Sequence, residues 1–142
     1  RITAAAIGVG IGRYAVEAAA DYARTRSVWG QPIGAHQAVS HPLAKAKIQV
    51  ELAALMTAKA AWQHDQGLPA GEASNMAKYA AAEVAVRAVD QAVQTHGGNG
   101  LASEYGLGAM LGSIRLGRIA PVSREMLLNF VAQSSLGLPK SY

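Results

Sequence analysis

The stretch EASNMAKYAAAEVAVRAVDQAVQTHGGNG, residues 72–100, decides the fold. Alanine and valine dominate residues 72–95, and polar side chains recur there at helical spacing, which predicts a long helix. Gly97-Gly98-Asn99-Gly100 ends the pattern, because consecutive glycines rarely continue a helix. The stretch therefore predicts a helix that stops at a glycine-rich loop.

Two further long helices are predicted before this stretch, over residues 1–28 and 36–66. Residues 30–34 separate them as a loop, and residues 67–71 end the second helix, because both segments combine glycine with proline. The second helix is indicated by apolar residues at intervals of three to four, namely Val39, Leu43, Ala46, Val50, Ala54, Ala58 and Ala61.

The first helix is expected to be buried, with an apolar face formed by Ile7, Ile11, Tyr14, Ala18 and Tyr22. Its three glycines, at positions 8, 10 and 12, cost helix stability at about 1 kcal/mol each relative to alanine. We expect these glycines to allow close approach of a neighbouring helix.

Two shorter helices are predicted after the glycine-rich loop, over residues 104–118 and 123–136. The chain holds 30 Ala but only 1 Phe and 2 Trp, a composition that favours helices packed through small side chains. We find no alternating strand pattern. The predicted fold is all-α, an antiparallel up-and-down bundle of three long helices plus two shorter C-terminal helices.

Composition limits the class of protein. The 142 residues, 51% of them apolar, are enough for one folded domain over residues 1–142 and argue against disorder. A dispersed net charge of +4 does not indicate nucleic-acid binding, and the longest uncharged run, residues 2–12, is too short to span a membrane. Because the chain starts inside a helical pattern without Met, we expect it to be part of a longer protein.

Two clusters could bind an anion. Gly97-Gly98-Asn99-Gly100 could present backbone N–H groups to an anionic oxygen, or it could simply stop a helix. Arg24 and Arg26, followed by Trp29, could complement a helix C-terminus, or one guanidinium could hold a phosphate beside the indole ring.

Other site classes are disfavoured. The four histidines, at 36, 41, 64 and 96, lack the spacing of a metal clamp, and we expect no metal. No Gly-x-Ser-x-Gly nucleophile motif occurs, and the absence of Cys excludes a thiol nucleophile. Glu83 and Asp90 lie near Arg87 on a predicted helix, where ion pairing or exposure is a commoner explanation than acid/base catalysis, and we assign them no catalytic role.

Together these pieces resemble the C-terminal helical domain of acyl-CoA dehydrogenases over essentially the whole chain. The resemblance depends on three blocks in order, YARTRSVWGQPI at 22–33, HQAV at 36–39 and DQAVQTHGGNG at 90–100, with Glu104-Tyr105 soon after. It implies a flavoenzyme whose N-terminal helical and middle β domains lie outside this chain.

The resemblance also implies FAD as the cofactor and assigns cofactor contacts, part of them to the flavin of a neighbouring subunit. The implied residues are Arg26, Ser27, Val28, Trp29, His36, Gln37, Gln94, Thr95, His96, Gly97, Gly98 and Ser123. The resemblance also implies that Arg1 lies near bound acyl-CoA.

The catalytic carboxylate that the resemblance implies is missing. Many relatives carry this Glu in a Tyr-Glu-Gly-Thr-Ser stretch, and here Pro121 occupies its position. Glu125 lies one helical turn onward and is expected to point elsewhere. Some relatives use a Glu immediately before the position of Arg1, which would lie outside the chain. Gly112-Ser113 also replaces a common Arg-Asp pair.

The resemblance implies that the longer protein oxidises acyl-CoA to 2,3-enoyl-CoA by α-proton removal and hydride transfer to FAD, and that this chain alone is inactive. Implied partners are acyl-CoA, an electron-transfer flavoprotein or equivalent acceptor, and further copies in a homodimer or homotetramer. We expect a cytoplasmic location, or a mitochondrial or peroxisomal one in a eukaryote, and neither nucleic acid nor membrane span. A flavin oxidase or monooxygenase on the same scaffold, and a non-catalytic helical assembly module, remain as alternatives.

Overall fold

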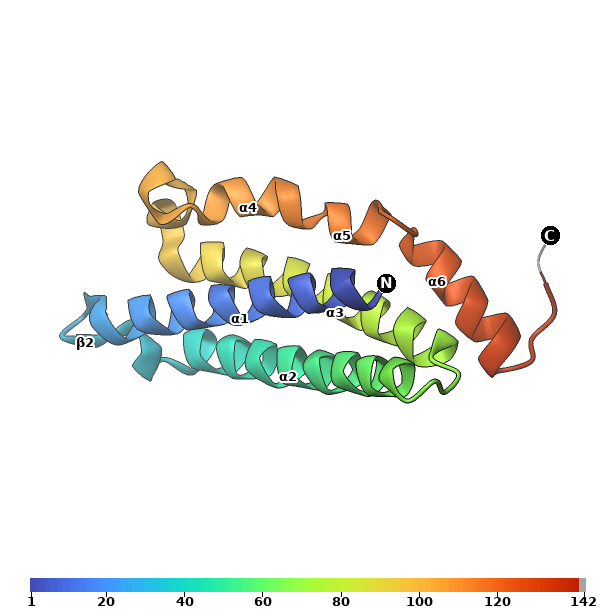
Figure 1. Cartoon of the computed structure of the whole chain (residues 1–142). Helices are drawn as coiled ribbons and strands as arrows, with labels where there is room; N and C mark the ends of the chain where they lie inside the picture. Colours follow the sequence, from blue (N-terminus) through green and yellow to red (C-terminus); the bar gives the residue numbers. More distant parts are fainter. Residues whose placement is uncertain (141–142) are drawn as a thin grey trace.

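A computed structural model describes residues 1–140 and shows a bundle of long helices with a C-terminal helical segment running alongside it (Figure 1). The long helices are α1 (Ile2–Thr25), α2 (Gln37–Asp65) and α3 (Gly71–His96). Helices α1 and α3 run in one direction, and α2 runs in the other (Figure 1). The predicted all-α antiparallel bundle of three long helices is confirmed, with bounds within about three residues of those expected.

The buried face of α1 differs from the predicted one. Ile7 and Tyr14 are more than half exposed, whereas small residues point inward: Ala5, Gly8, Val9, Gly12, Ala15, Val16, Ala19 and Ala23. A Cβ added to Gly8 would lie 3.1 Å from the carbonyl oxygen of Ala81 on α3. The two helices thus pack too closely for large side chains, which move to the flanks. Gly8 and Gly12 meet neighbours as expected, but Gly10 faces open space.

The repeat predicted for α2 needs a smaller correction. Leu43, Ala46 and Val50 are buried as expected, but Ala58 is exposed, and the buried stripe continues through Ala53, Thr57 and Ala60. From Ala46 to Ala58 the predicted series takes three successive steps of four, which drift away from a helix with 3.6 residues per turn, so the series leaves the buried face at Ala58.

A two-stranded hairpin replaces the end of the helix predicted over residues 1–28 and the start of the loop predicted at 30–34. Strands β1 (Ser27–Val28) and β2 (Gln31–Pro32) pair antiparallel, followed by the 3₁₀ turn η1 (Ile33–Ala35). Trp29 and Gly30 form its tip with φ of 54° and 80°, the pair of positive values that a tight hairpin turn requires. Two-residue strands carry no detectable alternation, so the sequence pattern did not reveal them.

The C-terminal part is more broken than the two predicted helices. After the 3₁₀ turns η2 (Gly97–Leu101) and η3 (Ser103–Tyr105) come α4 (Leu107–Ile114), α5 (Leu116–Ile119) and α6 (Arg124–Phe130), which continues as a π-helical turn, Val131–Ser135. The helix predicted from 104 starts later because Gly106 adopts a left-handed φ of 67°. These elements run antiparallel to α3 (Figure 1).

Candidate functional site

The C-terminal ends of α1 and α3 meet at a pocket of about 340 Å³. Residues from the end of α1 and the hairpin form one side, and residues from the end of α3 and its glycine loop form the other. The lining residues are Tyr22, Arg26, Val28, Ile33, Gln94, Thr95, His96, Gly97, Gly98 and Asn99. Two segments about 70 residues apart in sequence therefore share one cavity.

Arg26 supplies the charge of this pocket. It is the only ionised side chain among the described lining residues, apart from the titratable His96, and no acidic residue lines the pocket. Within residues 1–140, Arg26 makes no ion pair. The carbonyl ends of helices carry partial negative charge, so the ends of α1 and α3 by themselves disfavour an anion. The guanidinium of Arg26 offsets that field and is free to bind a phosphate group.

The glycine loop ends α3, which is one of the two uses that the sequence left open. Gly97 ends α3 with φ 59° and ψ −137°, a conformation suited to glycine, and its N–H donates to the carbonyl of Gln94. A Cβ on Gly98 would meet no atom within 4 Å, so neither packing nor a positive φ explains this glycine. The bare backbone at Gly98 leaves room in the pocket for a ligand.

Aromatic and amide side chains hold the two sides of the pocket together. Tyr22 on α1 stacks on His96 at the end of α3, with ring centroids 4.2 Å apart and planes at 28°. The Nδ2 of Asn99 donates to the hydroxyl of Tyr22 at 3.0 Å. The Nδ1 of His96 lies 2.8 Å from the carbonyl of Ala92, and because a carbonyl oxygen only accepts, the ring donates from Nδ1.

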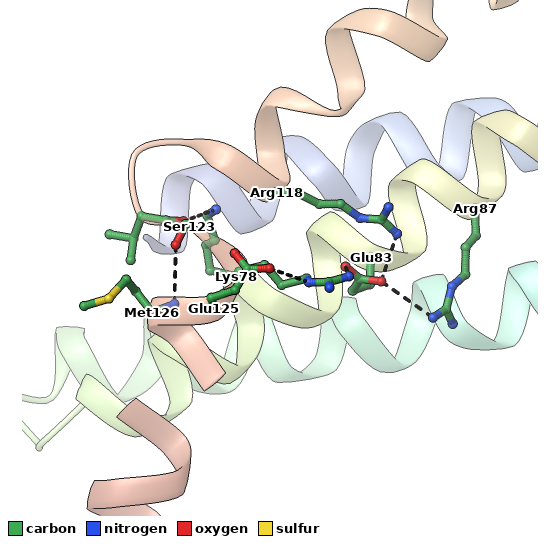
Figure 2. Close-up of polar contacts among 9 residues, drawn as sticks. Lys78, Glu83, Arg87, Arg118, Ser123, Glu125 and Met126 are labelled. Atoms are coloured by element: carbon green, nitrogen blue, oxygen red, sulfur yellow. Dashed lines mark hydrogen bonds and ion pairs between the residues drawn. The ribbon is translucent and has the colours of Figure 1, made fainter. Parts of the chain in front are cut away.

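Seven of the predicted cofactor residues line this pocket, and five do not. Ser27 and Trp29 lie in the adjoining hairpin, where Trp29 packs edge-on against His36 at 5.9 Å, and Gln37 begins α2. Ser123 lies beyond α5 and caps α6, its Oγ accepting from the N–H of Met126 at 3.4 Å (Figure 2). Arg1 lines a separate polar pocket with His64 and Asp65.

Tyr22, Ile33 and Asn99 were not among the predicted site residues. Tyr22 lies four positions before Arg26, the C-cap of α1, whose N–H donates to the carbonyl of Tyr22, and Asn99 directly follows Gly98. The closeness of Tyr22 to Arg26 and of Asn99 to Gly98 in the sequence could have indicated that both residues belong to the site.

A second pocket, about 380 Å³ and mostly apolar, lies between α1 and the α4–α5 segment. Ile7 and Ile11 of α1 face Leu116, Ala120 and Pro121 across it. Pro121, which matches the missing carboxylate, therefore borders an apolar cavity. Glu125 does not compensate, because hydrogen bonding from its own backbone N–H and then from Arg124 lowers its pKa, which weakens it as a base.

Buried charges on α3 hold the segment that carries Pro121 (Figure 2). Lys78 is 1% exposed, and its Nζ donates to the carbonyls of Gly117 and, at 2.8 Å, of Val122. Burial lowers the pKa of Lys78. Two carbonyls on either side of Pro121 are thus fixed to one side chain.

Glu83, to which we assign no catalytic role, is ion-paired, one of the two expectations, but it is buried and not exposed. Its carboxylate lies 2.9 Å from Arg118, 3.5 Å from Arg124 and 3.6 Å from Arg87 (Figure 2). One carboxylate on α3 therefore ties down both α5 and α6. The position of Glu83 as a single charged residue within the Ala/Val stretch 80–86 was the sequence feature that could have indicated its burial.

These features define a helical-bundle domain with an anion-suited pocket at one end and an apolar pocket along its length. The family model described as "Acyl-CoA dehydrogenase, C-terminal domain" matches residues 1–136, and the chain belongs to this family. Within residues 1–140, no helix is long and apolar enough to cross a membrane, and no cluster of metal-ligating side chains was found.

Individual relatives agree with this assignment. The chain is 65% identical over 144 aligned positions to acyl-CoA dehydrogenase FadE12 of Mycobacterium tuberculosis, covering 100% of this chain and 37% of that protein. It is 32% identical to butyryl-CoA dehydrogenase from Megasphaera elsdenii, with a TM-score of 0.92 over 97% of this chain and 36% of that one. It is 33% identical to PigA in its FAD complex, with a TM-score of 0.90 over 94% and 35%. The chain thus spans about a third of the length of these relatives.

Proposed function

We propose that the chain is the FAD-binding and oligomer-forming C-terminal domain of an acyl-CoA dehydrogenase, a longer protein that oxidises acyl-CoA thioesters to 2,3-enoyl-CoA. The pocket between α1 and α3 carries this proposal, because it combines an unpaired arginine with a glycine that packing does not require. The similarity to butyryl-CoA dehydrogenase and to the FAD complex of PigA supports it.

The residues of the pocket fit the diphosphate of FAD. Arg26 would bind a phosphate through its planar guanidinium, Gly98 would let the diphosphate approach the backbone, and Gln94 and Thr95 would add neutral polar contacts. Trp29, at the hairpin tip and 88% exposed, would present a flat apolar surface to a ring of FAD, in the same or a neighbouring subunit. FAD, when bound, supplies the acceptor of the hydride.

The apolar pocket beside Pro121 would receive part of the acyl chain. Pro121 cannot accept a proton, and Glu125 is held by Arg124, so we propose that the carboxylate base comes from the position before Arg1. This chain then contributes cofactor binding and a hydrophobic wall that excludes water from the reaction.

Assembly and location belong to the same proposal. An apolar stripe on α2, formed by Ile48, Leu52, Leu55 and Trp62, is more than half exposed along its length. We propose that a second copy of the protein covers it in a homodimer or homotetramer. The reduced flavin would be reoxidised by an electron-transfer flavoprotein or an equivalent acceptor. The cytoplasm is the proposed location, in line with the bacterial relatives.

A matched pair of arginine variants tests cofactor binding. In the full-length protein, Arg26→Ala should weaken FAD binding by about tenfold or more, because a charge-assisted hydrogen bond contributes about 1.5–3 kcal/mol. Arg24→Ala is the control, since Arg24 pairs with Asp21 and Glu17 instead of lining the pocket. FAD titration of the apoprotein gives both dissociation constants. Equal FAD dissociation constants for the two variants would show that the pocket is not part of the FAD site.

The activity is tested separately on the full-length protein. We expect flavin absorbance in the purified protein and ferricenium-coupled oxidation of at least one saturated acyl-CoA from a series of chain lengths. Flavin binding without oxidation of any member of the series would refute the dehydrogenase assignment while leaving the FAD site in place.

A further inference from the structure

We propose that the hydroxyl of Tyr22 is a ligand-binding donor in the α1–α3 pocket, directed at a phosphate oxygen of the FAD diphosphate. The inference rests on the proposed function and adds a contact that the resemblance did not assign. It starts from the hydrogen bond in which Asn99 Nδ2 donates to the Tyr22 hydroxyl at 3.0 Å.

That bond leaves the hydroxyl proton available. A tyrosine hydroxyl accepts and donates, and here its oxygen already accepts from Asn99. No acceptor for the hydroxyl proton is recorded within residues 1–140, although Tyr22 lines the pocket. Among the described residues this donor therefore has no partner, and it lies in a cavity that Arg26 makes attractive to anions.

The position of the ring is fixed independently of that donor. Tyr22 stacks on His96, and Tyr105 packs edge-on against both rings, with centroids 6.0 Å from Tyr22 and 5.2 Å from His96. Because His96 is 5% exposed and bonded to the backbone of α3, this cluster holds the ring of Tyr22 rigidly. A donor held in place before binding loses little entropy when the ligand arrives.

Arg26 and Tyr22 would act together on the same group. Arg26 is the C-cap of α1, four positions after Tyr22, and both residues line the same pocket. Arg26 supplies positive charge, whereas the hydroxyl supplies a directed hydrogen bond. Because the carbonyl ends of α1 and α3 carry partial negative charge, a bound anion needs such donors to offset the repulsion.

Two variants separate ligand binding from a role in holding the loop. Tyr22→Phe keeps the stacking on His96 but removes the hydroxyl, while Asn99→Ala removes the same Tyr22–Asn99 bond but keeps the hydroxyl. We expect Tyr22→Phe to weaken FAD binding about five- to tenfold and Asn99→Ala to weaken it less. Tyr14→Phe, on the exposed face of α1, is the control and should bind FAD as the unmodified protein does.

FAD titration of the full-length apoprotein and urea unfolding without FAD provide the two measurements. Weaker FAD binding by Tyr22→Phe than by Asn99→Ala, with similar unfolding midpoints, supports the proposal. Equal losses in the two variants, or no loss in Tyr22→Phe, overturn it. If Tyr22→Phe changed only the KM for acyl-CoA, the hydroxyl would instead contact the diphosphate of CoA, and the proposal would be wrong. Failure of the unmodified apoprotein to bind FAD would instead refute the proposed function.

Discussion

At the scale of residues, Gly98 and Gly100 occupy one loop but meet different surroundings. A Cβ on Gly100 would lie 2.6 Å from the carbonyl oxygen of Val93 and 2.8 Å from its Cα, both backbone atoms that cannot move aside easily. A Cβ on Gly98 would meet nothing within 4 Å. Gly100 is therefore required by packing, whereas Gly98 is required, on our proposal, by the ligand.

Alanine at each position should separate these requirements. We expect Gly100→Ala to lower the free energy of unfolding by about 1–3 kcal/mol, because the added methyl group overlaps the backbone of α3. Gly98→Ala should leave stability nearly unchanged and weaken FAD binding. Urea unfolding and FAD titration measure the two effects. A Gly98→Ala protein that binds FAD normally would count against a close approach of the diphosphate.

Lys78 offers a second prediction at this scale. Lys78→Met preserves most of the side-chain volume but leaves the carbonyls of Gly117 and Val122, which are partly buried, without their donor, so we expect a loss of about 1–3 kcal/mol. Lys45→Met, on the exposed face of α2, is the matched control and should change stability by less than about 0.5 kcal/mol. Similar urea midpoints for both variants would show that the ammonium does not stabilise the loop.

Residue identity alone predicted part of the site. Arg26 and the glycine loop could be singled out because a guanidinium and bare backbone suit phosphate. Tyr22 could not, because its use depends on Asn99, 77 positions away in sequence. The ion pairs of Glu83 with Arg118 and Arg124 could not be predicted for the same reason, because both arginines lie in later elements, far from Glu83 in sequence.

At the scale of elements, α1 and α2 are joined by an ion pair near the middle of their length. Arg13 Nη2 lies 2.6 Å from Glu51 Oε2, and Lys47 lies 2.8 Å from Oε1. Hydrogen bonds from Arg13 and then Lys47 lower the pKa of Glu51 from 4.5 to about 2. The charged form is thus favoured in the folded state.

The sign of the pH effect follows from that lowered pKa. The stabilisation is present above the unfolded value of 4.5 and is lost as the pH falls towards about 2. Glu51→Gln should therefore lose less stability than the unmodified chain between pH 5 and pH 2, as thermal unfolding can show. Glu72→Gln, at the exposed first turn of α3, serves as the control. Parallel curves for the unmodified chain and Glu51→Gln would exclude this contribution.

Element prediction succeeded where one pattern extended over many turns. The three long helices have that length, and Gly67 and Gly97, both with positive φ, mark helix ends that composition alone indicates. The faces of α1 were harder to predict, because its tightest contact uses glycine and alanine, which hydrophobicity ranks below Ile7 and Tyr14. In α4 to α6, contacts with α3 fix the helix breaks, and local sequence does not encode these contacts.

At the scale of the whole molecule, the exposed stripe on α2 sets the expected assembly. Leu52 and Leu55 lie at its centre, and a charge at either position would have to be buried against a partner. We expect Leu55→Glu to shift the full-length protein towards monomers in size-exclusion chromatography with light scattering. Gln66→Glu adds the same charge beyond the end of α2 and should leave the assembly intact. An unchanged mass for Leu55→Glu would place the interface elsewhere.

The exposed indole of Trp29 has a practical consequence. The chain contains only two tryptophans, and the other, Trp62, lies near the far end of α2, away from the hairpin. Trp29 is thus a natural fluorophore in the hairpin beside the cavity, whereas the emission of Trp62 overlaps that of Trp29 as background. Replacing Trp62 with Phe would leave Trp29 as the single tryptophan, whose emission maximum and quenching would report ligand binding in the neighbouring cavity in real time, without any attached dye.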